Sequence, residues 1–222
     1  ARRGRAHLDD VAERLAATRL VNHPKYAGLA GMFGPGRQPQ WTGQTRLWKP
    51  ELAMPLKLKK PSRIFVCDMG DLFYEGVPDA WILQVFDIMR QCPRHTFQIL
   101  TKRAQRMAEF CQRLRWDGAY YDKRPRHLGS QELRTGNGSI LWLADAADSP
   151  GYRLMGGGGC TGMPWVWVGV SVETQQTADA RIPWLLNTPA AVRFLSCEPL
   201  IDAIDLSKYI GAISLCIVGG ES

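Results

Sequence analysis

Long hydrophobic runs are missing from this sequence of 222 residues, although 45% of them are apolar. The longest apolar stretches, such as Ile64–Cys67 and Trp165–Val168, are broken within a few positions by Gly, Asp or Ser. Because a membrane-spanning helix needs about 20 consecutive apolar residues, we expect no such helix and no membrane partner. The amino terminus, Ala-Arg-Arg-Gly-Arg, has no apolar signal core, so the sequence predicts a cytoplasmic protein.

Residue patterns that bind metal ions are also scarce. The sequence has six cysteines and four histidines, with no CxxC pair and no HxH or HxxxH spacing. We therefore expect neither a zinc site nor a disulfide framework, and a reducing compartment is the simplest setting. Apolar surroundings predict that four cysteines are buried as small hydrophobic side chains: Cys67, Cys111, Cys197 and Cys216.

No long run of one charge sign is present. Lys and Arg number 28 and Asp and Glu 21, which gives a net charge of +7. This excess favours partners that carry phosphate without establishing one. Basic residues gather at 2–5 and at 57–63, but neither group is long enough to predict a nucleic-acid-binding tail.

Five short, nearly continuous apolar runs predict strands buried on both faces, as in a parallel sheet covered by helices. These runs are Ile64–Cys67, Thr96–Leu100, Trp165–Val172, Val192–Ser196 and Leu215–Val218.

Apolar residues at helical spacing predict helices between these strands. The first starts at Pro78 and Asp79, and the third starts near Thr174, where Pro183 should kink it or make its second part a separate turn. The expected inward residues are Trp81, Ile82, Val85, Phe86 and Met89 in the first, Met107, Phe110, Cys111 and Leu114 in the second, Ala178, Ile182, Leu185 and Leu186 in the third, and Leu8, Val11 and Leu15 in a helix near the amino terminus.

The alternation of strands and helices predicts an α/β fold with a parallel sheet, open or curled into a barrel, in one domain that spans residues 1–222. One segment departs from it. Between about 117 and 164 the periodicity is weak and four consecutive glycines occur at 156–159, so we expect an irregular insertion.

Polar residues follow every predicted strand. Since the carboxyl ends of parallel strands lie at one edge of a sheet, we expect a concave, charged site there that suits a zwitterionic or hydroxyl-rich ligand. The candidate cofactor-binding residues are Asp68, Met69, Gly70, Asp71, Thr101, Lys102, Arg103, Ser171, Glu173, Ser196, Glu198, Gly219, Gly220 and Glu221. No catalytic residue and no metal ligand is assigned.

Five ordered strings at these positions carry a family resemblance. They are Arg63-Ile-Phe-Val-Cys-Asp-Met-Gly-Asp-Leu-Phe73, His95-Thr-Phe-Gln-Ile-Leu-Thr-Lys-Arg103, Trp167-Val-Gly-Val-Ser-Val-Glu173, Arg193-Phe-Leu-Ser-Cys-Glu-Pro-Leu200 and Ile217-Val-Gly-Gly-Glu-Ser222. The sequence resembles, over residues 41–115 and 165–222, a bacterial and phage protein family of unknown function with an N-terminal three-cysteine motif, which looks related to radical S-adenosylmethionine (SAM) enzymes.

This resemblance implies a partial (β/α)6 TIM-like barrel of the radical-SAM type whose first strand is missing here. It implies SAM and a [4Fe-4S] cluster as cofactors and radical chemistry on an unknown substrate. In such an enzyme Met69-Gly70-Asp71 would hold the amino group of SAM, Ser171 and Glu173 its ribose or methionine part, and Lys102 or Arg103 its carboxylate.

None of the six cysteines has the spacing of the cluster ligands, and both ends of the chain look truncated. We therefore expect the chain to be a fragment that binds SAM at most weakly and is itself inactive, with the radical enzyme being the longer parent protein.

Two other functions stay open. The first is a nucleic-acid-binding module of phage or mobile-element origin, with stacking and phosphate contacts in the insertion. Its residues would be Trp116, Tyr120, Tyr121, Trp142 and Tyr152 with Lys123, Arg124, Arg126 and Arg134. The second is a hydrolase or lyase without a cluster, which would use Asp68, Asp71, Glu173 and Glu198 as metal ligands or as acid and base, with His95 away from the site.

Overall fold

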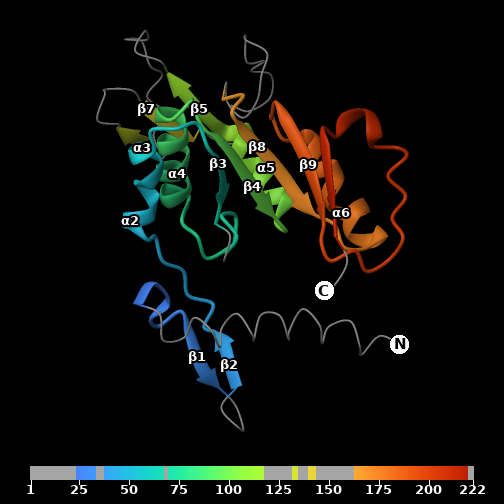
Figure 1. Cartoon of the computed structure of the whole chain (residues 1–222), viewed down its shortest axis with the longest axis horizontal. Helices are drawn as coiled ribbons and strands as arrows, with labels where there is room; N and C mark the ends of the chain where they lie inside the picture. The colour runs from blue at the N-terminus through green and yellow to red at the C-terminus, as the bar shows by residue number, and fades with distance from the viewer. Residues whose placement is uncertain are drawn as a thin grey trace. The chain divides into compact units, whose positions relative to one another are not determined.

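The chain forms two compact units, residues 1–51 and 52–222 (Figure 1). The computed structural model describes residues 24–33, 38–67, 70–117, 132–134, 140–143 and 163–219. In the first unit a short 3-10 helix, η1 (Pro24–Tyr26), precedes the antiparallel strands β1 (Ala30–Phe33) and β2 (Gln38–Trp41). The short helices α2 (Lys49–Leu52) and α3 (Met54–Lys57) follow.

The second unit is built on a five-stranded parallel sheet with the order β10-β9-β8-β4-β3. Its strands are β3 (Arg63–Val66), β4 (Thr96–Thr101), β8 (Val166–Ser171), β9 (Val192–Cys197) and β10 (Leu215–Val218). All five predicted strands are confirmed, and so is the α/β class. The described residues form no closed barrel.

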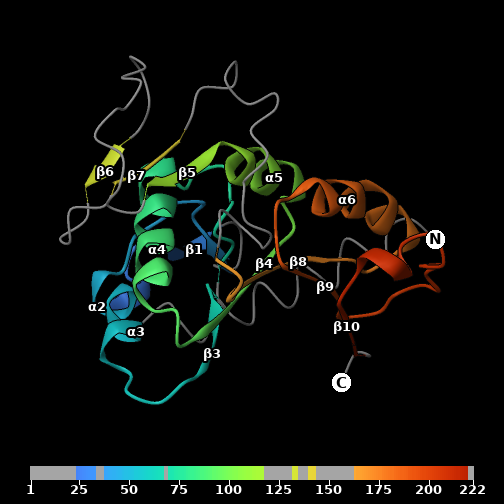
Figure 2. The same ribbon diagram turned by 90° about the horizontal axis from the view of Figure 1, so that it is seen from above.

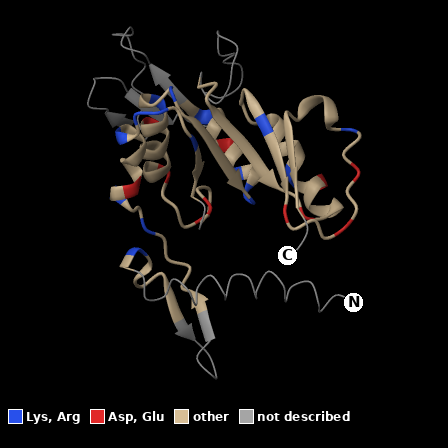
Figure 3. Ribbon diagram, viewed as in Figure 1, with Lys and Arg blue, Asp and Glu red and all other residues tan. Residues whose placement is uncertain are grey.

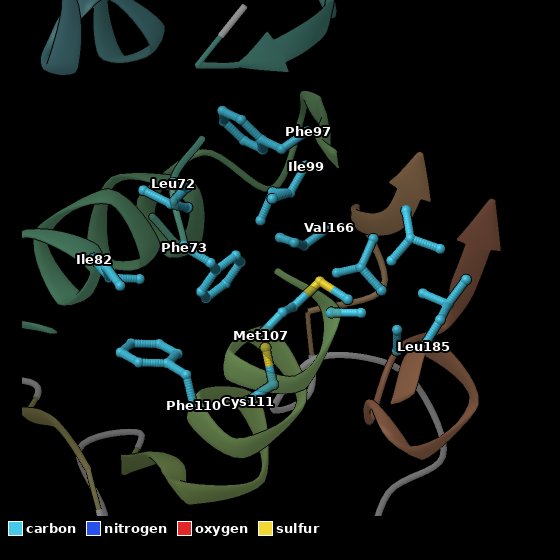
Figure 4. Packing of buried hydrophobic residues seen from close by; sticks show 14 of the residues in the cluster. Leu72, Phe73, Ile82, Phe97, Ile99, Met107, Phe110, Cys111, Val166 and Leu185 are labelled. Carbon is cyan, nitrogen blue, oxygen red and sulfur yellow. The ribbon is translucent and has the colours of Figure 1, made fainter. Parts of the chain in front are cut away.

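Three helices lie on one face of this sheet: α4 (Asp79–Gln91), α5 (Ala104–Arg113) and α6 (Gln175–Asn187) (Figure 2). The hydrophobic core lies between them and the sheet, where Phe73, Met107 and Val166 are fully buried (Figure 4). Alternate strand residues such as Phe97 and Ile99 point into this core, as expected from the two-residue period of a strand.

Helix α6 begins with a capping box in which the Thr174 hydroxyl accepts from the Thr177 backbone N–H. Contrary to the alternative of a separate second turn, α6 runs without interruption through Pro183. Pro183 is exposed, while Ile182 and Leu185 on either side are fully buried. Core packing on both sides of Pro183 therefore keeps the whole segment helical.

The predicted irregular insertion contains regular structure. Strands β5 (Leu114–Asp117), β6 (Glu132–Arg134) and β7 (Ile140–Leu143) form an antiparallel sheet with the order β5-β7-β6. Its strands are too short to show a clear sequence period, which is why the pattern missed them. The glycine run at 156–159 and the expected amino-terminal helix lie outside the described residues.

Burial of four cysteines was predicted, and two of these predictions are wrong. Cys111 and Cys197 are buried, whereas Cys67 and Cys216 are exposed. Cys67 directly follows β3 and Cys216 lies in β10, the two edge strands of the sheet. An edge strand has a neighbour on one side only, so an apolar run there is less completely covered.

In the part of the chain that the structure describes, no helix combines the length and apolar character needed to cross a bilayer.

A short 3-10 helix, η4 (Ile210–Ala212), precedes β10.

Candidate cofactor site at the carboxyl end of the sheet

The parallel strands bring four groups of predicted site residues to one edge of the sheet. Neighbouring strands β4, β8, β9 and β10 end at or next to Thr101, Ser171, Ser196 and Gly219. Ser171 and Ser196 lie directly opposite each other in the register of β8 and β9. Four further candidates lie outside the described residues: Asp68, Met69, Gly220 and Glu221.

Asp71 is fully engaged in holding the loop after β4. Its Oδ1 accepts from the Thr101 hydroxyl at 2.6 Å and from the Phe73 N–H at 2.9 Å. Its Oδ2 accepts from the Lys102 N–H at 3.0 Å and from the Arg103 guanidinium at 3.3 Å. Both carboxylate oxygens thus have donors within the protein, and Asp71 positions the Thr101–Arg103 loop.

Arg103 is held by the same loop. Its guanidinium lies 3.5 Å from a Glu75 carboxylate oxygen and 5.2 Å from the centre of the Tyr74 ring. Gly70, in contrast, has open space around it, because a methyl group there would meet no atom within 4 Å.

Glu173, just beyond β8, is the buried charge of the site, with 6% of the residue exposed. Its Oε2 accepts from Arg181 Nη1 at 2.9 Å. Lys102 Nζ lies 3.3 Å from Oε1, an ion-pair distance, but the angles do not make a hydrogen bond. Oε1 is therefore buried without a hydrogen-bond donor among the described residues.

Arg181 is the residue of this site that the sequence analysis did not select. The same Nη1 that binds Glu173 also donates to the Ser171 carbonyl oxygen at 2.6 Å. Arg181 lies in the middle of α6, eight positions after Glu173, and a basic residue in the helix that follows an acidic strand end was the available signal. It holds the turn between β8 and α6.

Glu198 and Gly219 pack against each other at the ends of β9 and β10. A methyl group on Gly219 would lie 2.5 Å from Glu198 Oε1, so the carboxylate lies directly over the Gly219 backbone. The Glu198–Pro199 peptide bond is cis, and Glu198 itself is exposed. An exposed carboxylate thus lies along the backbone at the same edge as Glu173.

The neighbouring thiol is not a nucleophile at neutral pH. Burial, a hydrogen bond with Cys216 and the negative charges of Glu173 and Glu198 raise the pKa of Cys197 to about 12. Because the thiolate is the reactive form, Cys197 stays protonated and inert under ordinary conditions.

The described cysteines do not fit an iron–sulfur cluster. Cys67, just after β3, and Cys216, in β10, lie at opposite edges of the sheet, and the described residues contain no group of three His, Cys, Asp or Glu side chains that could hold a metal ion. At the edge of the sheet, Glu173 Oε1 has an exposed cation, Lys102, beside it and no hydrogen-bond donor among the described residues.

His95 lies at the other end of the sheet, as predicted. It is 1% exposed, its Nδ1 accepts from the Ser62 N–H at 3.1 Å, and its Nε2 donates to the Pro55 carbonyl oxygen at 3.1 Å. Both ring nitrogens serve the packing of the segment before β3.

Of the aromatic and basic residues considered in the insertion, Trp116, Arg134 and Trp142 lie in β5, β6 and β7, and nothing is described of their side chains. The others are outside the described residues.

The sequence matches one protein family over residues 9–222, and that family is described as "Protein of unknown function (DUF5131)". No curated protein and no solved structure matches the sequence.

Proposed function

Since the chain belongs to the DUF5131 family of proteins of unknown function, its activity has to be argued from its own residues, and we propose that it binds S-adenosylmethionine as part of a radical-SAM-like enzyme. The site is the carboxyl edge of the sheet. The observation that carries the proposal is the buried Glu173 Oε1 that accepts no hydrogen bond from any described residue.

A buried acceptor without a donor costs about 1–3 kcal/mol, and more when it is charged. A ligand that donates a hydroxyl or ammonium hydrogen to Oε1 recovers this cost on binding. SAM carries both kinds of donor, in its ribose and in its methionine part. Lys102 Nζ lies 3.3 Å away on a side chain that is 46% exposed, so it can turn to a ligand carboxylate.

The two basic candidate residues, Lys102 and Arg103, differ in how many partners hold their side chains. Arg103 is held by Asp71, Glu75 and the Tyr74 ring, whereas the side chain of Lys102 has only the ion pair with Glu173 among the described residues. We assign the ligand carboxylate to Lys102 and a supporting role to Arg103.

The sheet supports the same proposal. Five parallel strands with α4, α5 and α6 on one face are compatible with a partial (β/α)6 barrel, in which ligands bind at the carboxyl ends of the strands. In radical-SAM enzymes the cluster supplies the electron that cleaves SAM. Because the described cysteines do not fit a cluster, the function proposed for this chain is cofactor binding.

Calorimetric titration of the purified chain with SAM tests the proposal. We expect Glu173→Gln to weaken binding by roughly 10-fold or more, because a hydrogen bond to a charged group contributes about 1.5–3 kcal/mol. Glu109→Gln on the exposed side of α5 is the matched control and should bind as the unaltered chain does. Equal affinity of the Glu173→Gln chain, with its urea unfolding unchanged, contradicts the site.

The radical chemistry needs its own experiment. A family member that carries the three-cysteine motif is expressed without oxygen, its iron and sulfide are measured, and 5′-deoxyadenosine is assayed after reduction with SAM. Iron, sulfide and deoxyadenosine together are the expected result. An intact cysteine motif without a cluster would leave SAM binding as the function and remove the radical step.

A further inference from the structure

The face of the sheet opposite α4, α5 and α6 carries an aromatic row. Phe65 on β3 lies opposite Gln98 on β4, and Gln98 lies opposite Trp167 on β8. The flanking residues Ile64 and Val66 pack into the core on the helix side. By the alternation of side chains along a strand, Phe65, Gln98 and Trp167 therefore share the face on which no described helix lies, here called the helix-free face. Phe194 on β9 lies on the same face and is buried, so the accessible part of this face is the row on β3, β4 and β8.

This row is accessible. Phe65 is 46% exposed, although a phenylalanine in a sheet is usually buried, and both Gln98 and Trp167 are partly exposed. Phe65 and Trp167 stand two strand spacings apart, about 9.6 Å. The Gln98 side chain between them has no hydrogen-bond partner among the described residues, so its amide is available to a ligand.

Positively charged residues lie at the start of β3 and in the segment before it. The Arg63 guanidinium lies 5.9 Å from the centre of the Trp167 ring, on the same face. Lys57, Lys59 and Lys60 are exposed in the segment that leads into β3 (Figure 3). Residues 52–67 contain no Asp or Glu, and none of these four cations forms an ion pair with a described residue.

We propose that this face binds single-stranded nucleic acid. Exposed aromatic rings stack on unpaired bases, the Gln98 amide bonds base edges, and the four cations neutralise phosphates. A duplex would hide the base faces that the row can use. An acidic peptide or another polyanion would satisfy the lysines but would leave the two aromatic rings without a stacking partner.

The surface differs from the residues 116–152 considered from the sequence. It also does not depend on SAM, because Glu173 and Lys102 lie at the carboxyl edge of the sheet. Failure of one proposal therefore leaves the other standing.

The first measurement is the fluorescence anisotropy of a labelled 20-nucleotide single strand, titrated with the full chain at several salt concentrations. For four phosphate contacts we expect a slope of log K against log salt of about −3. A duplex of the same length should bind more weakly. No single-strand binding at low salt, or equal binding of the duplex, overturns the proposal.

Substitutions measure separately how much base stacking and how much charge contribute to single-strand binding. Phe65→Ala and Phe65→Leu should each weaken binding on the order of 5- to 150-fold, the range for loss of one aromatic–base stack. The double variant Lys59→Gln, Lys60→Gln should reduce the magnitude of the salt slope by about 1.4. Ile210→Ala, another exposed apolar residue, and Lys208→Gln, another exposed cation, should change neither quantity.

Heparin serves as a polyanion without bases. The proposal requires that heparin competes only at low salt and binds the Phe65→Leu chain as well as it binds the unaltered chain. If the Phe65 variants bind the single strand with unchanged affinity, the surface is a general polyanion site and the proposal is wrong. Far-UV circular dichroism and urea unfolding confirm that each variant is folded.

Discussion

Gly169 in the middle of β8 shows how one residue sets the packing of a strand pair. It lies directly opposite Phe194 on β9. A methyl group on Gly169 would lie 2.5 Å from Cε2 of the Phe194 ring, which is too close for two carbon atoms. Phe194, only 1% exposed, thus fills the space that any side chain at position 169 would need.

We predict that Gly169→Ala lowers the free energy of unfolding by about 1–3 kcal/mol, since overfilled cores lose stability in this range. Gly211→Ala is the control, because a methyl group there meets no atom within 4 Å. Urea unfolding followed by circular dichroism measures both. Equal stability of the two variants would show that the Phe194 ring can move away without cost.

At the scale of elements, Asp71 links the loop after β3 to the turn between β4 and α5. One carboxylate accepts from the Thr101 hydroxyl, the Lys102 N–H and the Arg103 guanidinium. Arg106 on α5 also holds the loop after β3, with Nη2 donating to the Val77 carbonyl oxygen at 2.6 Å. The loop is therefore fixed from both sides before any ligand binds.

Removing this carboxylate should be costly. We predict that Asp71→Ala lowers the free energy of unfolding by roughly 2 kcal/mol or more, because partly buried donors lose their acceptor. Glu75→Ala, which removes a 69% exposed carboxylate from the same Arg103, should cost less than about 1 kcal/mol. Guanidinium unfolding compares the two, and similar losses would mean that Asp71 acts only as a surface charge.

At the scale of the molecule, the main hydrophobic core of the second unit lies on the helix side of its sheet, while the other face is buried at Phe194 and exposed at Phe65. Phe97 on β4 is 1% exposed on the helix side, and Phe65 on β3 is 46% exposed on the other. Both residues are phenylalanines on paired strands, so substituting each of them compares the contribution of the two faces to stability.

We predict that Phe97→Ala lowers the free energy of unfolding by about 3–5 kcal/mol, as for other buried phenylalanines. Phe65→Ala should cost less than about 1 kcal/mol, because its side chain already contacts water. Thermal and urea unfolding measure the difference. A large loss with Phe65→Ala would place the helix-free face within the core and would leave no free aromatic row.

Much of this architecture could be predicted from residue patterns. The runs at 96–100 and 192–196 are apolar because their strands are central in the sheet, and the helical spacing of Met107, Phe110 and Cys111 reflects the helix face that covers it. Local periodicity records burial directly, so elements that are deeply buried are the ones it predicts best.

The errors occurred where burial depends on neighbours that are remote in sequence. Cys67 and Cys216 lie in apolar runs, but their strands are at the edges of the sheet. Pro183 has a poor helix propensity, but Ile182 and Leu185 anchor α6 on both sides of it. Strand order and helix packing are tertiary facts, and no short window of sequence contains them.

The sequence by itself determined the parallel α/β class and the polar residues that follow its strands, because both depend on short-range patterns. Only the tertiary structure decided how those polar residues are used. It assigned Asp71 to internal hydrogen bonds, joined Arg181 to Glu173, and left Glu173 Oε1 buried without a donor among the described residues. The physical reason is that a hydrogen bond is satisfied or left open by atoms that the fold brings together from distant positions in the chain.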